Sequence, residues 1–199
     1  MIGIKDQYFG VEIEMTGITR EKAAEVLGDY FPGAVCHIGG TYDTWEVIDD
    51  SGKTWKLMFD SSIKAERLEG GSWRTINNGF YRAEMVTPKL KYDELPKMQE
   101  CIRRVRKAGA KVNSSCGLHV HIDAANHNRQ SLKNLLSIMY SKEDMLFKAL
   151  QVNEDRAQRW CKKVREPMLE KARKLNSEET CYLTKLERIW YEGRSGSRE

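Results

Sequence analysis

The chain has 199 residues, of which 31% are charged and 40% hydrophobic, and its formal net charge is +4. These values are ordinary for a soluble globular protein, and no apolar run approaches the roughly 18 residues that a membrane span needs. The first residues, Met-Ile-Gly-Ile-Lys-Asp, lack the apolar core of a signal peptide. We therefore expect a cytoplasmic protein with no membrane partner.

Cysteine usage and charge distribution further restrict which class of protein this can be. The five cysteines are odd in number and include no Cys-x-x-Cys pair, which argues against a disulfide framework and a zinc ribbon. Residues 1–100 carry a net charge of roughly −5 and residues 101–199 roughly +9. An acidic half that holds metal beside a basic half that holds polyphosphate is one interpretation, and solvated helix faces are the other. No recognised nucleic-acid motif accompanies the basic half, so nucleic acid is not an expected partner.

The beginning of the chain predicts strands with one inserted helix. Residues 8–15 alternate strictly between apolar and polar and predict a strand. A helix is expected over about 20–31, with Thr19 as its N-cap. Two runs rich in aromatic and β-branched residues, 44–49 and 54–59, flank a polar turn and predict a hairpin.

The middle of the chain adds a loop, a strand and a helix. Residues 61–79 are polar and Gly-rich and predict a loop, and residues 80–87 predict a strand. Apolar positions at helical spacing predict a helix over 94–108, with Asp93 capping its start and Gly109 its end.

The last part of the chain is mainly helical. Residues 117–123 alternate once more as a strand, and from about 129 to near 190 the spacing is helical. We predict an α+β fold with a mainly antiparallel sheet packed by helices. It forms a single domain over 1–199, with a strand-rich portion over 1–123 and a mainly helical portion over 124–199.

The first predicted strand separates two kinds of side chain. Because side chains alternate between faces, Glu12 and Glu14 share one face, opposite an apolar face. The two carboxylates are about 7 Å apart along the strand, where like charges repel. A metal site and an ordinary solvated face both explain them. The apolar side chains are expected in the core: Phe9, Val11, Ile13 and Met15.

The strand near residue 120 repeats this arrangement with imidazoles. His119 and His121 share one face, and they are two of only four histidines in the chain. At i, i+2 on one strand face they can converge on one ion, or on an ion and its ligand. The opposite face is expected to pack on the core through Leu118, Val120 and Ile122.

The strand over 80–87 contributes Glu84 on the same face as Arg82, and an ordinary surface ion pair is the alternative for these two. If the three strands share one sheet, they gather an oxygen-rich, nitrogen-poor cluster. Such a cluster suits Mg²⁺ or Mn²⁺ better than a structural Zn²⁺ site. Its members would be Glu12, Glu14, Glu84 and His119.

Four segments in this order resemble the amidoligase family, whose members are relatives of glutamine synthetase and glutamate–cysteine ligase. The resemblance covers roughly residues 8–123. The segments are Phe-Gly-Val-Glu-Ile-Glu at 9–14, Trp55 followed by Asp-Ser-Ser at 60–62, Ala-Glu-Met-Val-Thr-Pro at 83–88, and Gly-Leu-His-Val-His at 117–121.

The resemblance implies a glutamine-synthetase-like active-site sheet and an ATP-dependent carboxylate–amine ligase. In such ligases ATP phosphorylates a carboxylate, and an amine then displaces phosphate to give an amide. ATP, Mg²⁺ or Mn²⁺, and small-molecule or peptide carboxylate and amine substrates would be the partners. The implied catalytic and metal-binding residues are Glu12, Glu14, Glu84 and His119.

The resemblance also implies which residues would contact the nucleotide and which would lie near the substrate. His121 would contact the nucleotide phosphates, and we add Arg82 because phosphate recognition usually relies on arginine. Asp60 and Ser61 would lie near the substrate.

One family feature is missing from this sequence. Family members continue to a further strand with a Glu-Phe-Arg type motif, which supplies another metal ligand and a phosphate-facing arginine. No such segment follows residue 123. We expect a chain shortened at its C-terminus, or a site that has lost its function or is completed by another chain.

Two other classes of function stay open from the sequence. A metal-dependent hydrolase or cupin-like enzyme would use His119 and His121, although no further ligand lies at the short spacing after His121 that a cupin motif needs. A non-catalytic module that binds nucleotide or metal would use the same residues for interaction. Tightly held Zn or Fe without an ATP effect would indicate the former, and ATP binding without turnover the latter.

Overall fold

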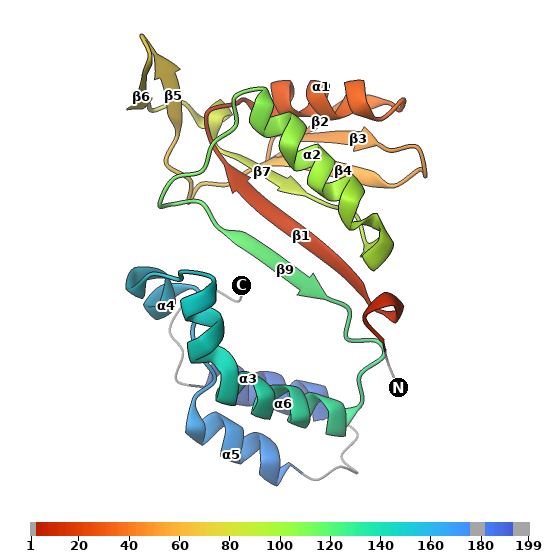
Figure 1. Ribbon diagram of the computed structural model, residues 1–199, viewed down its shortest axis with the longest axis vertical. Coiled ribbons are helices and arrows are strands. Elements are labelled where there is room, and N and C mark those ends of the chain that lie inside the picture. Colours follow the sequence, from red (N-terminus) through yellow and green to blue (C-terminus); the bar gives the residue numbers. More distant parts are fainter. Residues whose placement is uncertain (1–2, 176–181, 193–199) are drawn as a thin grey trace. The chain divides into compact units, whose positions relative to one another are not determined.

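The computed structural model describes residues 3–175 and 182–192, and the chain divides into two compact units, Met1–Ala124 and Ala125–Glu199 (Figure 1). The predicted α+β class is confirmed, and the main sheet has seven strands. All of its pairings are antiparallel.

The sheet of the first unit is centred on β1. From one edge the strands run β2, β3, β4, β7 and β1. The short β8 follows β7 along the same edge of β1, and β9 pairs with the other edge, since Phe9 is paired with both Leu90 and Ile122. The strands are β1 Tyr8–Met15, β2 Val35–Gly39, β3 Thr44–Ile48, β4 Thr54–Phe59, β7 Ala83–Val86, β8 Leu90–Lys91 and β9 Leu118–Ile122.

Two helices, α1 (Arg20–Tyr30) and α2 (Leu95–Lys107), bury the apolar face of this sheet. The predicted N-cap of α1 is confirmed, because the Thr19 side chain accepts a hydrogen bond from the Lys22 backbone N–H. The alternation predicted for β1 is also confirmed: its apolar side chains enter the core. The buried core includes Val11, Ile13, Met15, Leu27, Trp55, Leu57, Met85, Cys101 and Val105.

Four of the described strands were not predicted: β2, the two-residue β8 and two strands within the predicted loop over 61–79. These two, β5 (Glu66–Glu69) and β6 (Ser72–Thr75), form a separate hairpin. Gly70 and Gly71 make its turn with φ of 57° and 81°, which glycine adopts without steric penalty. β2, between α1 and β3, was missed as well. The side chains of β2 and of this hairpin are almost all exposed or half-buried, so their sequences carry little apolar alternation.

Two predicted boundaries shift because short 3-10 turns precede the regular elements. The strand expected over 80–87 begins at Ala83, after a turn at Gly79–Tyr81 in which the Asn78 side chain accepts from the Phe80 N–H. The helix expected at 94 begins at Leu95, after a turn at Tyr92–Glu94. The prediction of Asp93 as its cap is wrong, because Asp93 lies inside that turn.

The apolar side of β9 is exposed, which contradicts the prediction that it faces the core. Leu118, Val120 and Ile122 keep 62%, 55% and 54% of their surface accessible. Within the described residues β9 pairs with β1 alone and lies at the edge of the sheet. The apolar core therefore ends at β1. In β9 the alternation of apolar and polar residues does not mean that the apolar side chains are buried.

The second unit is helical in its described part, as predicted for the region after residue 129. Asn128 caps its first helix by accepting from the Ser131 N–H. A small core joins Val164, Met168 and Leu169. The helices are α3 Arg129–Ala149, α4 Glu154–Arg159, α5 Glu166–Lys174 and α6 Tyr182–Tyr191.

Some sequence expectations fall outside the described residues: Cys181 and the C-terminal segment 193–199. Within residues 3–175 and 182–192, no helix has both the length and the apolar character needed to cross a membrane.

Candidate active site

The sheet register brings the predicted site residues onto one face of β1. Glu14 lies directly opposite Glu84 of β7, and Glu12 lies opposite His119 of β9. His121 lies opposite Gly10 in the same way. Cross-strand partners share a face, so the assumption that these strands form one sheet with one polar face holds.

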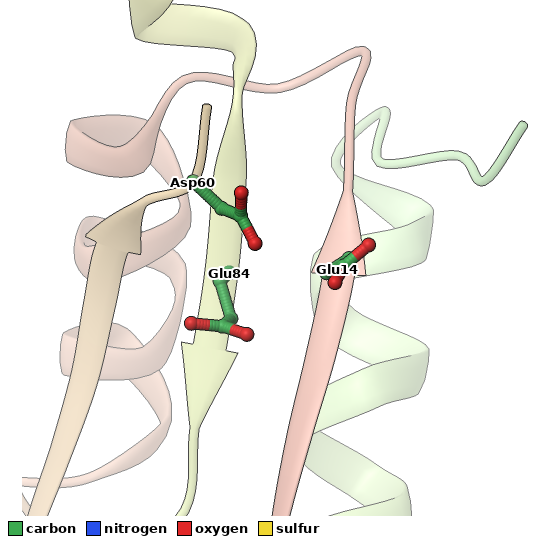
Figure 2. Close-up of side chains that lie close together, drawn as sticks. All are labelled: Glu14, Asp60 and Glu84. Atoms are coloured by element: carbon green, nitrogen blue, oxygen red, sulfur yellow. The ribbon is translucent and has the colours of Figure 1, made fainter. Parts of the chain in front are cut away.

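Three carboxylates converge on this face. Glu14, Asp60 and Glu84 each offer a ligand atom, and these atoms all lie within 4.8 Å of one another. Figure 2 shows them projecting from β1, from the segment after β4 and from β7. Glu14 is only 5% exposed, so little water screens the mutual repulsion of the group. A bound cation would offset that repulsion.

A second group of side chains lies beside the carboxylates. The Nδ1 atom of His119 is 3.4 Å from Oε2 of Glu12, and its Nε2 atom is 3.7 Å from Oε1 of Glu14. His121 Nε2 is 3.1 Å from Oε1 of Glu12. His119 therefore stands between both glutamates, while Glu12 pairs with both imidazoles.

The structure thus divides the cluster that the sequence predicted. Glu14 and Glu84 join Asp60, whereas Glu12 and His119 join His121. Asp60 was expected near the substrate instead. Its position could not be inferred from periodicity, because it follows β4 in an irregular segment.

Hydrogen bonds fix the orientation of two of the carboxylates. Glu14 Oε2 accepts from the Gly117 N–H at 2.6 Å, and Asp60 Oδ1 accepts from the Ser62 N–H at 2.6 Å. The other oxygen of Glu14, Oε1, faces His119 Nε2 at 3.7 Å. Preorganised carboxylates of this kind are typical of metal sites.

Arg82 and Ser61 lie next to this cluster and contact each other. The Arg82 Nη1 atom donates to the Ser61 carbonyl at 3.3 Å, so Ser61 contributes its backbone rather than its hydroxyl here. The Nε atom of Arg82 is buried and has no hydrogen-bond partner among the described residues. Because Nε has almost no accessible surface, only the Nη atoms of this guanidinium can meet an anionic ligand.

A buried arginine that the sequence did not single out supports this region. Arg20 is 4% exposed, and its Nη1 atom donates to the carbonyls of Gly79 and Arg82 at 2.7 and 3.0 Å. It also forms an ion pair with Asp43. The hydrogen bond from Arg20, together with one from His37, holds the pKa of Asp43 below its ordinary value. An arginine at the start of a predicted helix is expected to be exposed, so the sequence did not indicate this buried, supporting role for Arg20.

Fold and site together define an α+β protein whose polar sheet face carries a carboxylate cluster flanked by imidazoles. The family model described as putative amidoligase enzyme matches residues 5–199. The chain belongs to this amidoligase family, which makes its general class a ligase. No curated protein matches the chain, and no solved structure matches it either.

Proposed function

We propose that this protein is an ATP- and Mg²⁺-dependent carboxylate–amine ligase that forms an amide through an acyl phosphate. The observation that carries the proposal is the convergence of Glu14, Asp60 and Glu84 within 4.8 Å, in a chain that belongs to the amidoligase family. Such a ligase must bring two anions together, a carboxylate and the γ-phosphate, and a cation held by acidic side chains makes that approach possible.

The donor set fits a hard divalent cation. Three carboxylates and no sulfur favour Mg²⁺ or Mn²⁺ over Zn²⁺. In an octahedral Mg²⁺ site the ligand oxygens stand about 3–4 Å apart, which small rotations of these side chains would reach. We assign Glu14, Asp60 and Glu84 as the holders of the ion. When bound, it would neutralise phosphate charge and orient the γ-phosphate for transfer.

The neighbouring side chains supply the remaining functions. Glu12, paired with both imidazoles, holds them on the polar face, where His121 would donate to a phosphate oxygen. His119 bridges the two glutamates and couples the two groups. Arg82 would meet phosphate charge beside Glu84 through the Nη atoms of its guanidinium.

The chemistry needs little covalent help from the protein. An oxygen of the substrate carboxylate attacks the γ-phosphorus and ADP leaves. The amine nitrogen then attacks the acyl carbon, phosphate leaves, and the proton that the amine loses passes to the departing phosphate or to water. Positioning and charge neutralisation dominate such transfers. A sheet face lined by oriented carboxylates and imidazoles is suited to both positioning and charge neutralisation.

Calorimetric titration with a non-hydrolysable ATP analogue, with and without Mg²⁺, tests this proposal. We expect Mg²⁺-dependent binding in the wild type and loss of binding in Glu12→Gln/Glu14→Gln. Glu21→Gln, an exposed residue in α1, is the matched control and should bind as the wild type does. Tightly held Zn or Fe with no effect of ATP would instead favour a hydrolase or cupin-like enzyme.

A second titration separates the two groups of ligands. With Mn²⁺ alone, Asp60→Asn should weaken binding by about tenfold or more, a change of about 1.4 kcal/mol. Glu12→Gln should weaken it less, because Glu12 lies outside the three-carboxylate cluster. Equal losses of Mn²⁺ affinity in both variants would indicate that Glu12 is also a ligand of the ion.

A further inference from the structure

The polar face of β1 continues beyond the imidazoles to its other end, where the charge changes sign. Tyr8 shares this face with Glu12, four residues and about 13 Å away along the strand. Lys91 is its cross-strand partner in β8. The Nζ atoms of Lys89 and Lys91 lie 4.5 and 5.4 Å from the centre of the Tyr8 ring.

The lysines around Tyr8 differ in their ion pairing. Lys89 is 2.6 Å from Asp123, and Lys53 is 2.6 Å from Glu94. Lys91 takes part in no ion pair within residues 3–175 and 182–192, and its backbone N–H donates to Glu94 of the second pair. The end of the face therefore carries one uncompensated positive charge above an aromatic ring.

These residues line an open hollow of about 540 Å³ at the end of the sheet. Its walls come from the β3–β4 turn, from β8 and from the turn before α2. A concave surface with several convergent polar groups can hold a small ligand group. The lining residues are Tyr8, Ser51, Lys53, Lys89, Lys91 and Glu94.

No side chain of β1 separates this hollow from Glu12 on the polar face, and His121 of β9 stands beside Gly10. Gly10 lies midway between Tyr8 and Glu12 on the same face, and a Cβ added to it would meet nothing within 4 Å. An extended molecule can therefore lie along β1 from the carboxylates to the lysines without meeting a side chain at position 10.

We propose that the polar face of β1 binds an elongated substrate lengthwise, with Lys91 and Lys89 holding an anionic group about 13 Å from Glu12. The substrate class is an acid with two separated anionic groups, a carboxylate that reacts and a second carboxylate or a phosphate that is held beside Tyr8. This deepens the proposed ligase function and rests on it for the reacting end, whereas the anion subsite stands on its own geometry.

The subsite is tested alone by NMR titration of the ¹⁵N-labelled full chain with sodium phosphate or sodium acetate at constant ionic strength. Saturable shifts are expected at the amides of Tyr8 and Lys91. They should vanish in Lys89→Gln/Lys91→Gln and persist in Lys107→Gln, an exposed lysine at the end of α2. Phosphate binding more tightly than acetate would identify a phosphate group, and equal binding a carboxylate.

Lengthwise binding is tested with tetraglutamate and diglutamate in the presence of Mg²⁺. An extended peptide of four residues spans about 13 Å, so the longer peptide should bind at least about tenfold more tightly in the wild type. Gly10→Leu should remove that advantage without unfolding the chain, since the new side chain enters open space.

The outcomes separate the two proposals. Shifts that do not saturate, or that are unchanged in the double lysine variant, would overturn the anion subsite. Equal affinity for the two peptides would overturn lengthwise binding. Lysine-dependent phosphate shifts together with no effect of Mg²⁺ on any ligand would instead overturn the proposed ligase function and leave the subsite standing.

Discussion

The Oε2 atom of Glu14 accepts a hydrogen bond of 2.6 Å from the backbone N–H of Gly117. The backbone N–H of Glu14 in turn donates to the Gly117 carbonyl at 3.1 Å. These two bonds join the C-terminal end of β1 to the residue that leads into β9. They hold the most buried carboxylate of the cluster in one orientation, so structural and metal-binding roles of Glu14 can be separated by substitution.

Glu14→Gln should fold normally and lose Mn²⁺ binding. The glutamine carbonyl can still accept from Gly117, but the charge that attracts the ion is gone. Glu14→Ala should in addition lose about 1–3 kcal/mol of stability, because the Gly117 N–H is left unpaired. Urea unfolding and Mn²⁺ titration followed by electron paramagnetic resonance measure the two effects. Normal Mn²⁺ affinity in Glu14→Gln would show that Glu14 is not a metal ligand.

Arg20→Met should destabilise the first unit by about 3 kcal/mol, since it leaves the Asp43 carboxylate and three backbone carbonyl groups without their donor. We take the lower end of the range for broken buried ion pairs because the Asp43 side chain is 31% exposed. Urea unfolding gives the value. The control is Arg103→Met, whose side chain is 62% exposed and which should change stability by less than about 0.5 kcal/mol. Similar losses in both variants would contradict a special role for Arg20.

Asp49 organises the β3–β4 turn and should make stability depend on pH. Burial by itself raises the pKa of Asp49, but hydrogen bonds from the Ser51 hydroxyl, the Lys53 N–H and the Trp55 indole hold it well below its ordinary value of 3.8. Because the folded pKa is lower than the unfolded one, this stabilisation is fully present above about pH 4 and is lost as the pH falls further.

Asp49→Asn should therefore lower stability by about 1–3 kcal/mol at neutral pH and flatten the loss of stability below about pH 4. The reason is that the amide NH₂ would face the Trp55 N–H and the Lys97 ammonium, which are both donors. Urea unfolding at a series of pH values, followed through amide signals of β3 and β4, measures both effects. Asp29→Asn, an exposed site in α1, should keep the wild-type pH profile.

Val11→Asp and Val120→Asp should differ strongly in their effect on stability, although both valines alternate with site residues along their strands. Val11 is 4% exposed, so an aspartate there buries an unpaired charge and costs several kcal/mol, about 3 or more. Val120 is 55% exposed, and its variant should lose less than about 1 kcal/mol. Thermal unfolding of the two variants side by side provides the comparison. A severe loss in Val120→Asp would show that the apolar side of β9 is covered in solution.

The sequence by itself determined the local features of the site. Strict alternation over β1 places Glu12 and Glu14 on one face and Val11 on the other, because side chains alternate in any extended strand. Alternation in β9 likewise places His119 and His121 together. These are properties of a few consecutive residues, so they can be read without knowledge of the rest of the chain.

Only the tertiary structure decided which of these groups meet. Pairing of β1 with β7 and β9 sets Glu14 opposite Glu84, and the end of β4 brings Asp60 to them, which no local pattern encodes. The exposure of Val120 was decided in the same way, by the place of β9 at the sheet edge. Strand order and register are set by contacts between residues distant in sequence, and periodicity reports only which side chains share a face.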